Sequence, residues 1–277
     1  MKTIYFDTCI YNKLVDDKEM RDKIFYLRQN NLIEVIFSEY LFNEIVCAWS
    51  NSDKEKQKRV MELFQCTVKL ISGKILKQSE TIINEEIKAF LYNSDSQTVF
   101  LGQEQRDQMF HAMRRLANGE PITNTAPIMN ESNNKKIKHK KLKDVISKHK
   151  PKQENISMSF EEFYASAKKE ESEFIDKLLS GKILKEPNGN LIKKVEENIN
   201  SLPYFRSYLR MNSAYQYSFY MYKKLSRGDD YDLRHFVCAS SVDILVCDRD
   251  FLDILKWSYP LKDCFSLQNF LDARRAL

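Results

Sequence analysis

Glycine is scarce in this chain, with only six among 277 residues. None of them lies in the segment FDTCIYN, which follows the first apolar stretch. An enzyme that holds a dinucleotide on a Rossmann-type fold needs a glycine-rich turn at this point, because side chains would keep the backbone away from the pyrophosphate. The sequence therefore argues against a metal-free Rossmann-like enzyme.

The chain also lacks paired cysteines and long apolar runs. Its six cysteines form no Cys-x-x-Cys pair, and no histidine-rich spacing completes a zinc site. We interpret them as reduced thiols and expect the four near acidic residues, Cys9, Cys47, Cys238 and Cys247, to be small buried apolar residues. No apolar run approaches the roughly 20 residues that span a bilayer, and Asp7 interrupts the apolar start. These absences predict a cytoplasmic protein.

Charge of one sign is concentrated in only one place. The 44 basic and 39 acidic residues give a net charge of +5, but residues 135–152 carry nine lysines and one aspartate. Such a density can bind phosphates through counterion release, and a solvated loop or a docking site for a protein partner are the alternatives. The lysines that we expect to contact nucleic acid are Lys135, Lys136, Lys138, Lys140 and Lys141. They lie in a polar stretch, 118–157, that we expect to form a flexible loop.

The two ends of the chain alternate between β-prone and helical segments. Strands are expected at 2–6 and 32–37, and Ser38 is a suitable N-cap for a helix at 40–49. Near the C-terminus, helices are expected at 231–239 and 251–257 and strands at 242–247 and 264–267, followed by a closing helix. This alternation predicts an α/β fold with a central parallel sheet.

The middle of the chain, 73–225, has helical rather than alternating apolar spacing. Ser159 and Glu162 form a capping box before one helix, and an aromatic-rich helix is expected at 204–225, where core packing explains the aromatics better than base stacking does. The similar words KLISGKILK and KLLSGKILK, which begin at Lys69 and Lys177, are interpreted as two helices that end on a glycine. We expect this stretch to be a large, mostly helical insertion into the α/β core.

Two aspartates follow predicted strands directly. Asp7 comes after the first strand and Asp248 after the strand at 242–247. Reactive groups in open α/β sheets gather beyond the carboxyl ends of the strands, so both residues are expected there. Carboxylate oxygens are natural ligands for Mg²⁺ or Mn²⁺, which promote phosphodiester hydrolysis. The sequence thus offers acids for a metal site at one sheet edge.

Four segments in order along the chain, IYFDTCIYNKL, SEYLFNEI, DYDLRHFVCAS and DILVCDRDF, resemble the motifs of PIN-domain nucleases. The resemblance covers about 125 residues, 1–72 and 226–277. It implies a three-layer α/β/α core and a metal-dependent endoribonuclease that leaves 5′-phosphate and 3′-hydroxyl ends. The acids it implies as metal ligands and catalytic residues are Asp7, Glu44, Asp232 and Asp248.

The match departs from the family pattern at two points. Val246 stands where the family usually has a hydroxyl residue, and the short loop after the third motif leaves Asp229 or Asp230 as alternatives to Asp232. Asp250 is expected beside the site. His235 is expected to pack or hydrogen-bond within its own helix, and a supporting role beside the metal ligands is the alternative. Each of these acids also has an ordinary interpretation as a helix cap or a solvated carboxylate.

The resemblance suggests several partners. RNA is the expected substrate, and the settings it suggests are a toxin held by an antitoxin, or an RNA-processing or defence nuclease. A dimer of this chain is a further expectation by analogy. Two rival functions remain open: a structure-specific DNA nuclease, and a non-catalytic module that binds nucleic acid or protein on the same fold.

Overall fold

The computed structural model describes residues 1–50, 54–95, 98–120, 158–179, 189–222, 229–257 and 263–274. Most of the expected flexible loop at 118–157 lies outside the described residues, and so do the five lysines from Lys135 to Lys141. Within the described part, no helix combines the length and the apolarity that crossing a membrane requires.

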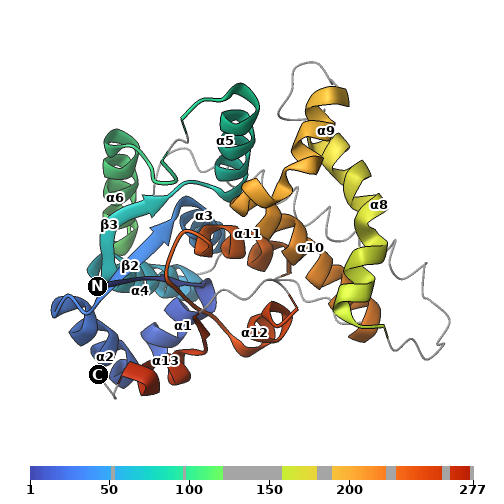
Figure 1. The fold of residues 1–277 in the computed structure, drawn as a ribbon. Helices are drawn as coiled ribbons and strands as arrows, with labels where there is room; N and C mark the ends of the chain where they lie inside the picture. The colour runs from blue at the N-terminus through green and yellow to red at the C-terminus, as the bar shows by residue number, and fades with distance from the viewer. Residues whose placement is uncertain are drawn as a thin grey trace.

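A five-stranded, all-parallel sheet forms the centre of the molecule (Figure 1). Its strand order is β3-β2-β1-β4-β5, and the strands are β1 (Lys2–Phe6), β2 (Ile33–Ser38), β3 (Ile71–Leu76), β4 (Ile244–Val246) and β5 (Cys264–Phe265). The first strand thus pairs with one from near the C-terminus, with Phe6 opposite Val246. The predicted α/β class and parallel sheet are confirmed.

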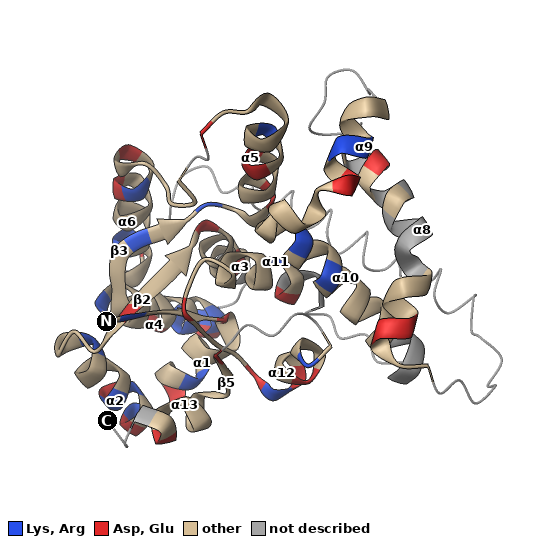
Figure 2. Ribbon diagram, viewed as in Figure 1, with Lys and Arg blue, Asp and Glu red and all other residues tan. Residues whose placement is uncertain are grey.

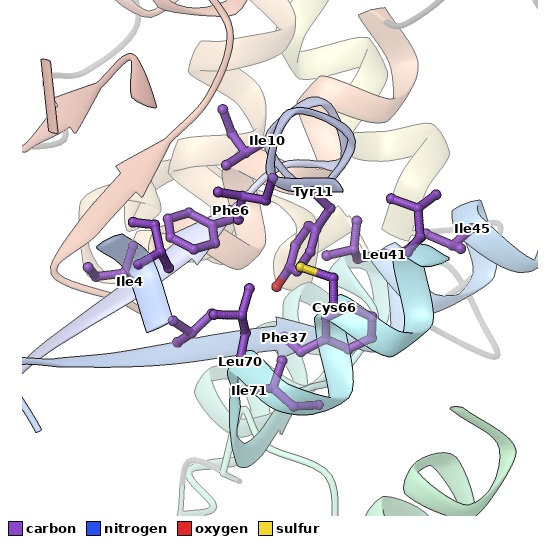
Figure 3. Close-up of a cluster of buried hydrophobic side chains, with 14 of the residues drawn as sticks. Ile4, Phe6, Ile10, Tyr11, Phe37, Leu41, Ile45, Cys66, Leu70 and Ile71 are labelled. Carbon is purple, nitrogen blue, oxygen red and sulfur yellow. The ribbon is translucent and has the colours of Figure 1, made fainter. Parts of the chain in front are cut away.

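The sheet buries one face against helices from both ends of the chain. Alternation along β1 directs Ile4 and Phe6 to this face, where a cluster of buried apolar side chains surrounds Tyr11 (Figure 3). The helices that contribute to this core are α1 (Thr8–Asp16), α2 (Lys18–Gln29), α3 (Glu39–Ser50), α4 (Lys54–Leu70), α6 (Gln103–Ala117) and α13 (Leu267–Arg274).

The opposite face of the sheet carries a second core. Tyr5, Ile36 and Leu245 point to this side, where they pack with buried residues of the covering helices. Most of these residues come from α10 (Pro203–Tyr222), α11 (Asp229–Ala239) and α12 (Arg249–Leu255). Helices on both faces of one parallel sheet make a three-layer α/β/α arrangement.

A third core joins helices beside the sheet (Figure 1). Its buried residues come mainly from α5 (Ser79–Tyr92), α8 (Phe160–Leu178), α9 (Gly189–Glu197) and α10. The capping box of Ser159 and Glu162 opens α8 as predicted. At the start of α10, the backbone N–H groups of Tyr204 and Phe205 donate to Glu86, which satisfies two donors of that helix terminus.

The structure corrects the predicted boundary at residue 72. Residues 71–76 continue the sheet as β3, and α6 adds Met113 and Leu116 to the core under the first face, so the α/β core extends into the segment expected as an insertion. The helix predicted for KLISGKILK is therefore wrong from Ile71 onward. Gly73 does not end a helix. It lies in β3 with a φ of +97°, a conformation that is open mainly to glycine. The register between β3 and β2 shifts at this point.

Other predictions for the middle segment hold or lie outside the described residues. The predicted helix at 204–225 is present as α10 as far as Tyr222, and 223–225 lie outside the described residues. Phe205, Tyr215 and Tyr217 on it are buried, which confirms that these aromatics pack in the core. The glycine of KLLSGKILK lies outside the described residues.

Candidate metal centre

Asp7 and Asp248 lie together because their strands are neighbours. Asp7 follows β1 and Asp248 follows Cys247 at the end of β4, and both strands run in the same direction. The strand order reverses at this pair, since β2 and β3 extend from one side of β1 and β5 from the far side of β4. Such a switch point is where open α/β sheets form their binding crevice.

Each of these aspartates caps the helix that follows it. Oδ1 of Asp7 accepts from the Ile10 N–H at 3.0 Å, and Oδ1 of Asp248 accepts from the Phe251 N–H at 2.8 Å. The interpretation as helix caps is therefore correct for both. Capping uses only one carboxylate oxygen of each aspartate. The second oxygen of Asp7, Oδ2, accepts from the Asp248 N–H at 3.2 Å. The caps fix the direction of both carboxylates at the edge of the sheet.

Cys9 completes a group of three potential ligands. Its thiol donates to Oδ2 of Asp248 at 3.4 Å, and one ligand atom from each of Asp7, Cys9 and Asp248 lies within 4.8 Å of the others. A group of this composition could hold a metal ion. The expectation of a buried apolar Cys9 is wrong, because its position in the first turn of α1 leaves the residue exposed at the acidic cluster.

Burial and mutual repulsion make this acidic cluster costly to ionise. Burial raises the pKa of Asp7 to about 7, and the nearby carboxylate of Asp248 adds to the rise, while His235 and backbone hydrogen bonds oppose it. Burial likewise raises the pKa of Asp232 to about 7, although His235 and a hydrogen bond from Tyr215 lower it. Asp7 and Asp248 act on Asp232 in the same direction as burial. A bound cation would therefore stabilise the ionised forms of Asp7, Asp232 and Asp248.

Glu44 reaches the centre from another helix. Ser38 ends β2 and caps α3 by accepting from the Leu41 N–H at 3.0 Å, and Glu44 follows on that helix. Its Oε2 accepts hydrogen bonds from the Thr8 hydroxyl and from Nε2 of His235, the latter at 2.9 Å. Neither Glu44 nor Asp232 belongs to the three-residue group found among the described residues.

His235 connects the centre to the sheet. It is buried, as the packing interpretation requires, but its hydrogen bonds go to residues outside its own helix. Its Nδ1 lies 2.7 Å from the Tyr5 hydroxyl on β1, and that hydroxyl lies 2.8 Å from Oγ of Ser38 on β2. Burial lowers the pKa of His235, but the hydrogen bond to Glu44 and the charges of Glu44, Asp7 and Asp232 more than offset this, so the pKa is raised. The imidazole therefore stands among carboxylates.

The remaining candidate acids have other positions. Asp229 and Asp230 begin α11, one turn before Asp232, and their side chains lie outside the described residues. Asp250 is exposed in the first turn of α12 and is not one of the three residues grouped with Asp7.

Sequence reasoning missed Thr8 and Tyr5 as partners at the centre, and it placed Cys9 near the acids without a role as a ligand. The signal for Thr8 and Cys9 was their place directly after Asp7, where a helix begins and its first turn faces the sheet edge. The signal for Tyr5 was a phenol between two apolar residues, Ile4 and Phe6, of a strand, since a buried hydroxyl needs a partner.

The fold and the centre together define an α/β protein with an acidic cluster at the carboxyl edge of a parallel sheet. Comparisons of the chain with protein-family models, curated proteins and solved structures find no match.

Proposed function

We propose that this protein is a PIN-like endoribonuclease that uses Mg²⁺ or Mn²⁺ held by Asp7, Glu44, Asp232 and Asp248. The observation that carries the proposal is the convergence of Asp7 and Asp248 at the ends of adjacent parallel strands. Asp232 adds to it, because its pKa responds to both of these charges. The motif resemblance described above supplies the reaction class.

The residues present suit a hard divalent cation. When bound, such an ion neutralises charge on a phosphodiester and lowers the pKa of an attacking water. The protein's own contribution is orientation. The backbone donors of Ile10 and Phe251 hold Asp7 and Asp248 in fixed directions, so little rearrangement is needed when an ion binds.

The centre reaches the surface at Cys9. Asp7 is only 3% exposed, whereas Cys9, two residues later, is exposed. We propose that a phosphodiester approaches the centre from the side of Cys9. No covalent enzyme intermediate is required for water to attack in line.

The choice of RNA as the substrate rests on the resemblance and on the lysine-rich segment 135–152. On the described helices α2, α6 and α9, basic and acidic residues occur together (Figure 2). The concentrated positive charge of the chain is instead in that segment. We propose that its lysines bind the RNA backbone. The resemblance to PIN-domain nucleases suggests a toxin, an RNA-processing nuclease or a defence nuclease, with an antitoxin or a second copy of this chain as the partner.

The test is cleavage of labelled single-stranded RNA and DNA of one sequence, with Mn²⁺, with Mg²⁺ and with EDTA. Wild type is compared with Asp7→Asn and with Asp17→Asn. The matched control is Asp17, which caps α2 through the Met20 N–H at 3.0 Å. We expect metal-dependent RNA cleavage in wild type and Asp17→Asn, and its loss in Asp7→Asn.

Other outcomes would replace the proposal. Cleavage of DNA alone would favour a structure-specific DNA nuclease. Tight binding without cleavage of either strand, in every metal, would favour a binding module on this fold. Full activity in Asp7→Asn would show that the centre described here is not the catalytic one.

A further inference from the structure

We propose that His235 is a positioning residue that holds Glu44 in the orientation needed to bind the metal ion. The inference rests on the proposed function, because Glu44 is a ligand only in that function. Its evidence is a buried series of hydrogen bonds that links Glu44 to two strands of the sheet through His235, Tyr5 and Ser38.

The donors and acceptors in this series can be arranged in two ways, and Nε2 of His235 donates to Glu44 in both. If Nε2 of His235 carries the proton, it donates to Glu44, and Nδ1 then accepts from the Tyr5 hydroxyl. The Tyr5 oxygen can in turn accept from Ser38, whose own oxygen accepts from the Leu41 N–H. A doubly protonated ring would reverse the Tyr5 and Ser38 donors, but Nε2 would still donate to Glu44.

Packing fixes the imidazole as firmly as the hydrogen bonds do. His235 is 2% exposed and lies against the ring of Tyr40, edge to face, with centroids 5.2 Å apart. Its ring centroid is 5.7 Å from that of Tyr5. Tyr5 lies on β1, two residues before Asp7. The hydrogen bonds therefore fix the position of Glu44 relative to the strand that ends at Asp7.

The hydrogen bonds also distinguish the two oxygens of Glu44. Thr8 and His235 both donate to Oε2. Oε1 accepts no hydrogen bond from any described residue, so it is the oxygen that remains open to a cation. The two donors therefore set the rotation of the carboxylate about its last bond. A histidine that fixes a carboxylate in this way typically changes metal affinity or activity by about 10–100-fold when it is lost.

The experiment compares three variants of the series with two controls. His235→Gln keeps an N–H donor near Nε2, His235→Leu removes it, and Tyr5→Phe removes only the hydroxyl that holds the ring. The controls are Tyr11→Phe, which removes an equally buried hydroxyl that has no hydrogen-bond partner in the described part of the chain, and His111→Gln at an exposed site. For each protein, the Mn²⁺ dissociation constant, kcat and KM for RNA, and the metal-free unfolding midpoint are measured.

A positioning role predicts a specific pattern. His235→Leu should weaken Mn²⁺ binding by about 10-fold or more and lower kcat with little change in KM. His235→Gln should recover most of this loss, and Tyr5→Phe should weaken binding by a few-fold, roughly 3–10. Both controls should bind Mn²⁺ and cleave RNA as wild type does.

Two results would overturn the inference. If folded His235→Leu keeps wild-type Mn²⁺ affinity and kcat, His235 only packs, and the proposed nuclease function stands. If His235→Leu fails to fold, Tyr5→Phe decides: unchanged affinity and kcat in that variant rejects the positioning role. A wild type that neither binds Mn²⁺ nor cleaves nucleic acid would reject the proposed function and, with it, this inference.

Discussion

The backbone N–H of Asp248 donates a hydrogen bond to Oδ2 of Asp7 over 3.2 Å, although the two residues are 241 positions apart. The N–H of Asp7 donates in turn to the carbonyl of Val246, also at 3.2 Å. These bonds continue the pairing of β1 with β4 beyond the last residues of both strands. The acidic centre therefore exists only when the two ends of the chain have paired.

Asp248→Asn should separate capping from metal binding. An amide oxygen can still accept from the Phe251 N–H, so the free energy of unfolding without metal should change by less than about 1 kcal/mol. The lost charge should weaken Mn²⁺ binding by at least about tenfold, which calorimetry can measure. Asp250→Asn, on the exposed first turn of the same helix, is the control and should bind Mn²⁺ normally. Equal binding by both variants would remove Asp248 from the centre.

Elements that depend on the hydrophobic pattern and the helix caps of neighbouring residues were predicted correctly from the sequence. Strand β1, the Ser38 cap and the capping box of Ser159 and Glu162 depend on neighbours within a few residues, and all are present. Strand β3 was missed because Gly73 resembled a helix end, whereas pairing with β2 decides its conformation. Long-range pairing of this kind leaves little trace in a local pattern.

The candidate site shows the same division. The positions of Asp7 and Asp248 follow from the rule that acids at strand ends share one edge, and the structure brings them together. The bond from His235 to Glu44 could not be predicted, because it depends on the contact between α11 and α3, which are far apart in the sequence.

Metal-free protein should lose stability as the pH rises from about 4 to 7. Asp7 and Asp232 have pKa values raised to about 7 in the folded state, so between these limits the folded protein keeps protons that the unfolded chain releases. The stabilisation is complete below the unfolded pKa and is lost as the pH rises through the folded value. His235, whose pKa is also raised, acts in the same direction.

Asp232→Asn tests this pH dependence. The variant cannot ionise at this position, so in EDTA near pH 8 it should be more stable than wild type, by roughly 1 kcal/mol or more, with a smaller difference near pH 5. Urea unfolding at the two pH values measures the difference. Mn²⁺ should stabilise wild type more at the higher pH, because protons compete for the same carboxylates. A variant that is less stable than wild type at both pH values would contradict the argument.

Tyr11→Phe should stabilise the protein. The Tyr11 hydroxyl is fully buried beside Cys66 in the core under the first face of the sheet, with no hydrogen-bond partner among the described residues (Figure 3). An unsatisfied buried hydroxyl costs about 1–3 kcal/mol, so its removal should raise the free energy of unfolding by about 1 kcal/mol. Tyr5→Phe, which removes a hydroxyl with two partners, should lower it by a similar amount. Urea unfolding of both variants would contradict this view if they changed stability alike.

Cys9 should give the centre an affinity for thiophilic metals. Its sulfur lies within 4.8 Å of ligand oxygens of Asp7 and Asp248, and a thiolate favours Zn²⁺, Cd²⁺ or Co²⁺ over Mg²⁺. Cys9→Ser should therefore weaken Cd²⁺ binding by about tenfold or more while changing Mn²⁺ binding much less. Absorbance of the Co²⁺ complex gives a direct measurement, because the sulfur-to-metal charge-transfer band should be lost in Cys9→Ser and kept in Cys264→Ser, whose partly exposed thiol lies on β5. Co²⁺ bound to wild type without that band would show that Cys9 stands beside the ion without binding it.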